Sequence, residues 1–100
     1  MNIYHCSQTV NQGYDTYSDM VVCAKNEDAA RLIHPRSVDE KIEMKEGHWL
    51  EEGEWFDKEY NGHTINDSSW ALPKDIVVKF LGSAAESIQP GVLCASYHAG

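Results

Sequence analysis

Basic residues and long apolar runs are both scarce in this 100-residue sequence. Eight Lys and Arg stand against sixteen Asp and Glu, so the formal net charge is −8. That charge repels phosphate backbones and anionic membranes, and we expect no direct binding to nucleic acid or to a membrane. No apolar stretch approaches the roughly 18 residues of a membrane-spanning helix, and the amino terminus lacks the pattern of a signal peptide. The sequence therefore predicts a cytosolic protein.

Cysteine is scarce too, with Cys6, Cys23 and Cys94 as the whole set. An odd number without a C-x-x-C pair predicts reduced thiols rather than a disulfide framework. Each thiol lies in an apolar, strand-like run, so we expect all three to pack in the core. Neither these thiols nor the five histidines show the spacing of a zinc site, and no metal or cofactor is predicted. The histidines are His5, His34, His48, His63 and His98.

Signatures of catalysis are missing as well. The chain contains no G-x-S-x-G, Walker, H-E-x-x-H or dinucleotide glycine motif. A chain of this length buries only about two-thirds of its unfolded surface, which leaves little room for a deep cleft. Pairs such as Asp15 with His5, or Cys94 with His98, occur by chance in any small domain. We therefore predict a non-enzymatic protein without catalytic residues.

What the sequence does contain is a set of short strands. Strands are predicted where β-branched and apolar residues gather, at 3–8, 19–25, 75–81 and 92–97, and the first two are expected to pair. Gly82 is expected to end the third of these strands. We expect Tyr4 and Cys6 to share one face of the first strand, because side chains alternate along a strand.

One short helix is predicted between the second and third of these strands. Asn26 is a suitable N-cap, and Pro35 cannot continue the helix, so the element is expected over residues 27–34. Ala29, Ala30 and Ile33 form its apolar face. The order of elements predicts one α+β domain over residues 1–100, with a small, mostly antiparallel sheet of about four to six strands and the helix packed on a face.

An acidic, aromatic excursion at about residues 37–69 interrupts this pattern. Residues 39–59 hold nine acids and three lysines, and so −6 of the net charge. We expect an edge strand around Ile42 and Met44 and a hairpin from Trp49 to Phe56. Aromatic anchors among dense carboxylates are typical of a surface that docks on a basic protein. The predicted partner-binding residues are Trp49, Glu51, Glu52, Glu54, Trp55, Phe56, Asp57 and Glu59.

Two alternatives stay open at this point. The aromatic side chains of the excursion fit equally well into a second small core, with the carboxylates left at the surface. The loop at residues 11–19 is a candidate ligand site, because Tyr14, Asp15, Tyr17 and Asp19 can hydrogen-bond a small ligand, together with His5 or His98. It is also compatible with an ordered turn whose polar side chains bond to the backbone.

Three segments carry a resemblance: NQGYDTYSDMVVCAKNEDAARLIHP, WALPKDIVVKFLGSA and GVLCASYHAG. They resemble a family of small bacteriophage and prophage proteins without an assigned activity. The resemblance covers roughly residues 1–36 and 70–100, whereas the acidic excursion replaces a shorter linker. It implies a phage accessory protein that acts in the cytosol of a bacterial host. Small acidic phage proteins include inhibitors of host or defence machinery, among them anti-CRISPR proteins that mimic nucleic-acid charge.

The sequence thus predicts a phage accessory protein that binds a basic, nucleic-acid-binding host or defence protein through its acidic excursion. The alternative is a small-ligand-binding or sequestering protein that uses the loop at residues 11–19. A monomer and a homodimer are both compatible with the sequence, because exposed edges of a small sheet can pair across a two-fold axis.

Overall fold

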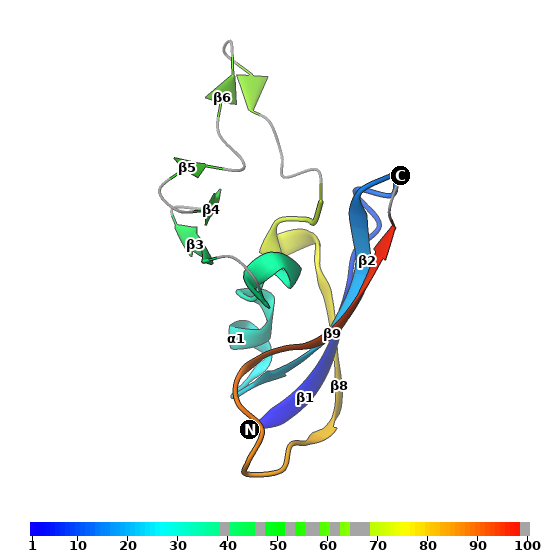
Figure 1. Ribbon diagram of the computed structural model, residues 1–100, viewed down its shortest axis with the longest axis vertical. Helices are drawn as coiled ribbons and strands as arrows, with labels where there is room; N and C mark the ends of the chain where they lie inside the picture. Colours follow the sequence, from blue (N-terminus) through cyan, green and yellow to red (C-terminus); the bar gives the residue numbers. More distant parts are fainter. Residues whose placement is uncertain are drawn as a thin grey trace.

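A four-stranded antiparallel sheet forms the framework of the protein (Figure 1). The computed structural model describes residues 1–38, 41–45, 48–51, 54–55, 59–60, 63–64 and 69–98. The strand order is β8-β1-β2-β9. The bounds are Asn2–Ser7 for β1, Thr16–Ala24 for β2, Val77–Ser83 for β8 and Gly91–His98 for β9. The predicted α+β class and the pairing of the first two strands are confirmed.

The helix α1 (Glu27–Arg31) and the 3-10 helix η1 (Pro35–Val38) lie on one side of this sheet (Figure 1). Asn26 caps α1 as predicted, because its side-chain oxygen accepts a hydrogen bond from the amide of Ala29 at 2.8 Å. The α-helix ends at Arg31, shorter than the predicted range of 27–34. A helix of this length has little stability of its own in water, so packing on the sheet must hold it.

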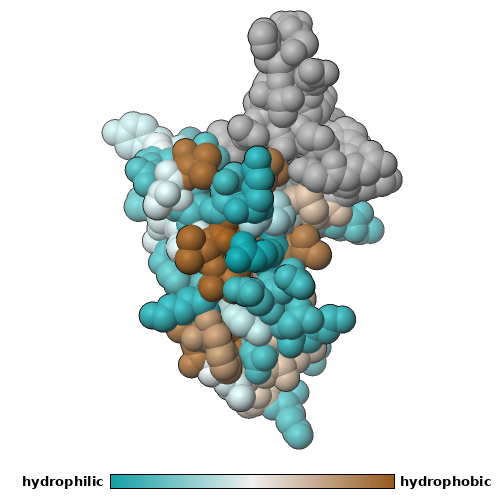
Figure 2. Space-filling view, turned by 180° about the vertical axis from the view of Figure 1, so that it is seen from behind, coloured by the Kyte–Doolittle hydropathy of each residue, from teal (hydrophilic) through white to brown (hydrophobic). Residues whose placement is uncertain are grey.

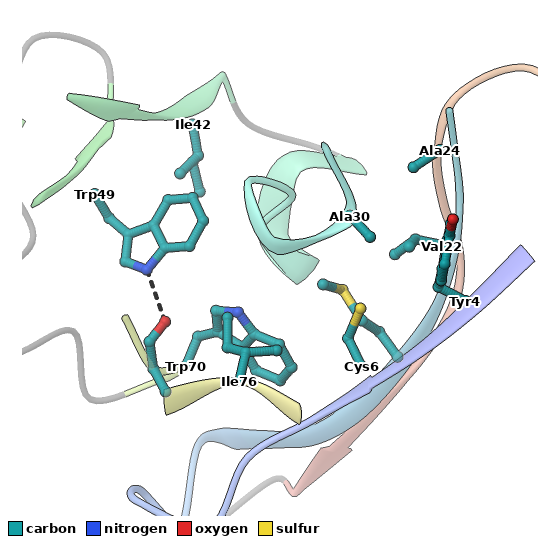
Figure 3. Packing of buried hydrophobic residues seen from close by; sticks show 11 residues of the cluster. Tyr4, Cys6, Val22, Ala24, Ala30, Ile42, Trp49, Trp70 and Ile76 are labelled. Carbon is teal, nitrogen blue, oxygen red and sulfur yellow. Dashed lines mark hydrogen bonds between the residues drawn. The ribbon is translucent and has the colours of Figure 1, made fainter. Parts of the chain in front are cut away.

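The core lies between the sheet and these helices (Figure 3). Tyr4 and Cys6 face it from β1, as predicted, because alternate residues of a strand share a face. The buried cluster consists of Tyr4, Cys6, Met20, Val22, Ala24, Ala30, Ile42, Trp49, Trp70, Ala71 and Ile76. Burial raises the pKa of the Cys6 thiol to about 11, against a smaller lowering by the Arg31 guanidinium. Cys6 is therefore an inert packing residue at neutral pH.

The Arg31 side chain fastens the helix to the segment that precedes β8. Its guanidinium donates to the carbonyl of Pro73 at 3.0 Å and to the carbonyl of Ile76. Pro73 begins the 3-10 helix η2 (Pro73–Asp75), which leads into β8. These bonds hold together two segments that are more than forty residues apart in the chain.

The strand β2 is buried on both faces, as its continuous apolar run predicts. Met20 and Val22 face the helices, whereas Cys23 points to the opposite face and is also fully buried. Its sulfur lies 3.9 Å from the sulfur of Met1 and 3.9 Å from the carbonyl oxygen of Ile88. The core positions predicted for Cys6 and Cys23 are confirmed. The prediction for Cys94 is wrong, because this residue is exposed on the edge strand β9.

Two strand ends differ from the sequence prediction. β2 begins at Thr16, three residues before the predicted start at Asp19, because Thr16 and Tyr17 pair with β9. Gly82 does not end β8, which continues to Ser83. Tyr4 pairs with Phe80 and Ile3 with Gly82, so one extra residue bulges out of the ladder. Gly82 has φ 157°, a conformation open mainly to glycine, which accommodates this irregularity.

The acidic excursion forms two further small sheets. β3 (Ile42–Lys45), β4 (His48–Glu51) and β5 (Glu54–Trp55) make a three-stranded antiparallel sheet. The predicted edge strand and hairpin are confirmed, with Leu50 opposite Trp55. A separate pair consists of β6 (Glu59–Tyr60) and β7 (His63–Thr64). Figure 1 shows β3, β4 and β5 beyond α1 along the long axis of the molecule.

The surface seen from behind mixes polar and apolar residues, with the apolar ones in small separated groups (Figure 2). Scattered apolar residues are usual on protein surfaces and by themselves mark no interface. Within the described ranges, no helix is both long enough and apolar enough to span a bilayer.

Two buried tryptophans provide a matched test of the core. The indole N–H of Trp49 donates to the carbonyl of Ala71 at 2.9 Å, whereas that of Trp70 has no acceptor among the described residues. Both substitutions to Phe remove the same atoms, but only Trp49→Phe leaves a buried carbonyl without its donor. We expect Trp49→Phe to lower the free energy of unfolding by about 1 to 3 kcal/mol more than Trp70→Phe. Urea denaturation of the two variants measures this difference, and equal losses would contradict it.

Candidate protein-binding site

Trp49 joins the acidic excursion to the core of the domain. Its side chain is fully buried, and its ring meets the ring of His34 edge-on, with centroids 4.9 Å apart. Ile42 is buried and Met44 half-buried beside it, whereas Glu43 between them is exposed. This alternation is what a strand with one packed face produces. β3 and β4 are therefore fixed to the core through one face, with Glu43 directed to solvent.

The prediction that Trp49 is a partner-binding anchor is wrong. A fully buried indole offers no surface to a partner, because the surrounding core already covers it. Trp49 follows instead the second interpretation of the sequence, in which aromatic residues of the excursion fold back into a core. For Glu51, Glu54, Trp55 and Glu59 the structure describes the backbone but not the side chain. Glu52, Phe56 and Asp57 lie outside the described residues, so these seven binding residues stay predictions.

The strand register of the excursion brings acidic residues together. Glu51 on β4 is the direct cross-strand partner of Glu54 on β5, and it also pairs with Ile42 on β3. Like charges directly opposite each other destabilise a strand pair. A nearby cation offsets such repulsion.

His34 is a buried residue that the sequence did not single out. It is fully buried, and its ring Nδ1 accepts a hydrogen bond from the amide of Arg36 at 3.0 Å. Its carbonyl accepts from the amide of Ser37 at 2.9 Å and from the hydroxyl of the same residue at 2.6 Å. His34 thus serves both as a packing partner for Trp49 and as the start of the turn into η1. The sequence signal for the burial of His34 was its position at the end of the apolar run Leu32–Ile33, directly before Pro35.

The predicted ligand loop is shorter than residues 11–19. Tyr17 and Asp19 lie on β2, so only Tyr14 and Asp15 of the predicted set belong to the connection. Tyr14 is 81% exposed. Asp15 has φ 59°, in the left-handed region that Asp tolerates, and its carboxylate accepts a hydrogen bond from the Tyr97 hydroxyl at 2.9 Å. That bond raises the pKa of Tyr97, because the neutral phenol is the donor.

A buried glutamine holds this loop in place. Gln8 is 4% exposed, and its side-chain nitrogen donates to the carbonyls of Asn11 and Tyr17 at 2.8 and 2.7 Å. Its side-chain oxygen accepts from the amide of Asn11 at 2.8 Å. The Asn11 side chain in turn donates to the carbonyl of Trp70. The loop is therefore an ordered turn tied to the core by side-chain hydrogen bonds.

Two hollows adjoin the loop. The larger has a volume of about 530 Å³ and is lined by Gln12, Gly13, Tyr14, Tyr97 and His98. The smaller, about 250 Å³, is lined by Gln8, Thr9, Asn11, Gln12, Thr16, Ser18 and His98. His98 borders both, which brings it to the loop as the sequence suggested. Hydroxyl, amide and imidazole groups around a hollow can orient a small polar ligand.

The sequence attributes the pairs of Asp15 with His5 and of Cys94 with His98 to chance, and the structure gives these residues other partners. His5 bonds to Asp19 rather than Asp15, with Nε2 and Oδ2 2.9 Å apart. The Ser18 hydroxyl donates to the same carboxylate at 3.2 Å. Cys94 and His98 pair with Val21 and Thr16, at separate points of the ladder. In the described part of the chain, no group of three or more His, Cys, Asp or Glu could hold a metal ion.

Searches against protein-family models, curated proteins and solved structures find no match for this chain.

Replacing Gln8 tests whether the loop depends on its side chain. Gln8→Leu keeps a similar volume but leaves two carbonyls and one amide without their partner. We expect the free energy of unfolding to fall by about 2 to 4 kcal/mol. The matched control is Gln89→Leu at an exposed position, for which a change within about 0.5 kcal/mol is expected. Equal midpoints of urea denaturation for the two variants would contradict a role for Gln8.

Proposed function

We propose that this protein is a non-enzymatic binding protein that docks on a basic surface of another protein through its acidic segment, residues 39–59. The resemblance of residues 1–36 and 70–100 to small phage proteins supports a role as a phage accessory protein in a bacterial host. The partner is then a host or defence protein whose own nucleic-acid-binding surface is basic. Inhibition by occupying that surface, as anti-CRISPR charge mimics do, follows from the same chemistry.

The burial of Trp49 is the observation that carries this proposal. Because β3 and β4 are fixed to the core through Trp49, these strands of the acidic segment are attached to the folded domain. A charged surface with a defined position loses less conformational entropy on binding than a free acidic chain does. The described strands β3 and β4 are thus held in place before a partner binds, which favours docking through the residues they carry.

Charge distribution adds the second support. Residues 39–59 hold −6 of the total charge of −8, so most of the net charge belongs to one segment of the chain. A concentrated field of one sign steers a partner of opposite sign and speeds its association. The pairing of Glu51 with Glu54 adds a local repulsion that a Lys or Arg of the partner relieves.

Charge-neutralising variants test this function. A Glu51→Gln, Glu52→Gln, Glu54→Gln variant removes three charges from the segment, and a Glu27→Gln, Asp75→Asn, Glu86→Gln variant removes three exposed charges elsewhere. Both variants carry −5 instead of −8. The partner is captured from a bacterial host lysate with the wild-type protein, and its association rate is then measured with all three proteins. We expect the first variant to associate at least about tenfold more slowly at low salt, and the control to stay close to wild type.

Ionic strength provides an independent measurement on the same three proteins. The Debye length falls from about 30 Å to about 3 Å between 0.01 M and 1 M salt, so the wild-type association rate should fall steeply across that range. A rate that does not change with salt contradicts docking through the acidic segment. Equal losses in both variants would show that overall net charge matters and that the segment has no special role.

The loop hollow favours one second candidate, a small-ligand-binding or sequestering protein. The observation behind it is the 530 Å³ hollow, in which exposed Tyr14 and His98 stand beside a loop held by the Gln8 hydrogen bonds. The lining is polar enough to orient a nucleotide or another small polar molecule, as ligand sites require.

Thermal denaturation in the presence of nucleotides and divalent metal ions tests the second candidate. A ligand that binds only the native state at about 100 times its dissociation constant adds about 2.7 kcal/mol of stability, and so raises the melting temperature. We expect Tyr14→Ala and His98→Ala to abolish such an increase. If no compound raises the wild-type melting temperature, or if the two variants keep the increase, ligand binding at this hollow is contradicted.

A further inference from the structure

The two edges of the main sheet differ in how they are protected. β8 carries Lys79 in its middle and has the bulge at Gly82. A charge and a bulge are the devices by which natural sheets prevent pairing at an open edge. Apolar side chains on this strand, such as Phe80 at 56% exposure, therefore lie on an edge that resists pairing.

The opposite edge, β9, is protected far less. Its sequence, GVLCASYH, contains no Asp, Glu, Lys, Arg or proline. Leu93 and Tyr97 are 45% and 49% exposed, and Cys94 between them is exposed as well. The ladder between β9 and β2 has two register shifts, and only the one at Leu93 places an extra residue on β9, because the other places Ser18 out of the ladder on β2. No described strand pairs with the outer side of β9.

The backbone of β9 directs hydrogen-bonding groups outward. Tyr17, the partner of Tyr97, donates its amide to the carbonyl of Ser69 at 2.8 Å and accepts at its carbonyl from the Gln8 side chain. Both groups of Tyr17 thus point away from β9, and the pair with Tyr97 is of the non-hydrogen-bonded type. The amide and carbonyl of Tyr97 therefore face the open edge, and by alternation so do those of Ala95.

A groove of about 490 Å³ runs beside this edge, between β9 and η1. Pro35, Arg36 and Val38 line it from η1, and Leu93, Ala95 and Tyr97 line it from β9. Among the described residues that line it, Arg36 carries a charge and none is a carboxylate. The groove can receive apolar side chains from a strand that pairs with β9.

We propose that β9 pairs antiparallel with β9 of a second copy of this chain, about a two-fold axis, so that the two four-stranded sheets become one. An antiparallel pair of identical strands is self-complementary in its hydrogen bonds, as a two-fold interface requires. Each copy places exposed side chains of its β9 beside the groove of the other. The pairing covers the exposed apolar residues of both strands at once.

Charge argues for a second copy as the occupant. A chain with a net charge of −8 repels itself, so it associates with itself most readily where acidic residues are absent. Residues 87–98 contain no Asp, Glu, Lys or Arg, and the described strands of the acidic segment belong to different sheets. The basic partner proposed above would gain nothing from this uncharged strand. Every folded copy of the chain carries the same β9 edge. Pairing between two copies therefore covers both edges and leaves neither open to other strands.

Sedimentation and light scattering over a range of protein concentrations test the pairing. We expect a dimer for the wild type at high concentration, dissociating on dilution. Cys94 supplies a second measurement, because it is the exposed thiol, whereas Cys6 and Cys23 are buried. The dimer covers Cys94, so its reaction rate with a thiol reagent should fall as the protein concentration rises.

Substitutions at Ala95 separate this edge from the other. Ala95→Pro removes the outward amide while the bonds to β2 remain, because proline is tolerated where a strand N–H faces outward. Ala95→Lys places a charge in the groove and serves if the proline variant fails to fold. The control is Leu81→Lys on β8. We expect both Ala95 variants to dimerise at least about tenfold more weakly, and Leu81→Lys to dimerise like the wild type.

Three results would overturn the proposal. They are a wild-type protein that stays monomeric at all concentrations, a dimer that survives both Ala95 substitutions, and a dimer that Leu81→Lys disrupts. The acidic triple variant, Glu51→Gln, Glu52→Gln, Glu54→Gln, should still dimerise, since its changes lie outside β9. Loss of dimerisation and loss of docking on a basic partner are therefore distinguishable.

Discussion

The Trp49 indole donates a hydrogen bond to the carbonyl of Ala71, and this bond joins the sheet of the acidic segment to the chain that leads into the main sheet. The Trp49 ring itself is fully buried in the core. Trp49 belongs to the appended sheet of the acidic segment, and Ala71 to the chain that enters β8 through η2. His34 closes the same contact from the side of η1. The position of β3 and β4 relative to the main sheet depends on this contact and on Ile42 of β3, which is buried in the same cluster.

In the main sheet, the central strands are the buried ones and the edge strands are the exposed ones. β1 and β2 occupy the centre, where their apolar side chains pack beneath the helix, and Cys23 is buried on the other face as well. β8 and β9 are the edges, and each carries exposed large apolar residues: Val77, Phe80 and Leu81 on β8, and Leu93 and Tyr97 on β9. The two proposals place electrostatic docking and apolar pairing on different parts of the molecule: the acidic segment is proposed to bind a basic partner, and the edge strand β9 is proposed to pair with another copy. Such a dimer presents two acidic segments, which strengthens binding to a partner with two basic sites through effective concentration.

The candidate site was predictable only in its composition. The excess of carboxylates in residues 39–59 and the short strands that carry them follow from local sequence, and the strands at Ile42 and around Leu50 are confirmed. Whether an aromatic residue faces a partner or the core does not follow from local sequence. Trp49 was predicted to face a partner, but it is buried in the core. The loop at residues 11–19 was also predictable only in part. Tyr14 and Asp15 lie in it, but pairing with β9 drew Tyr17 and Asp19 into β2.

By itself the sequence determined the local features: the Asn26 cap, the alternation of Tyr4 and Cys6, the two-sided burial of β2 and the concentration of charge in one segment. These depend on neighbouring residues and on the period of the backbone, which a sequence displays directly. Only the tertiary structure decided that Cys94 is exposed, that Trp49 is buried, and that Gly82 continues a strand. Burial at these positions depends on which strand lies at an edge and which segment packs over it, and strand order is set by contacts between residues far apart in the chain.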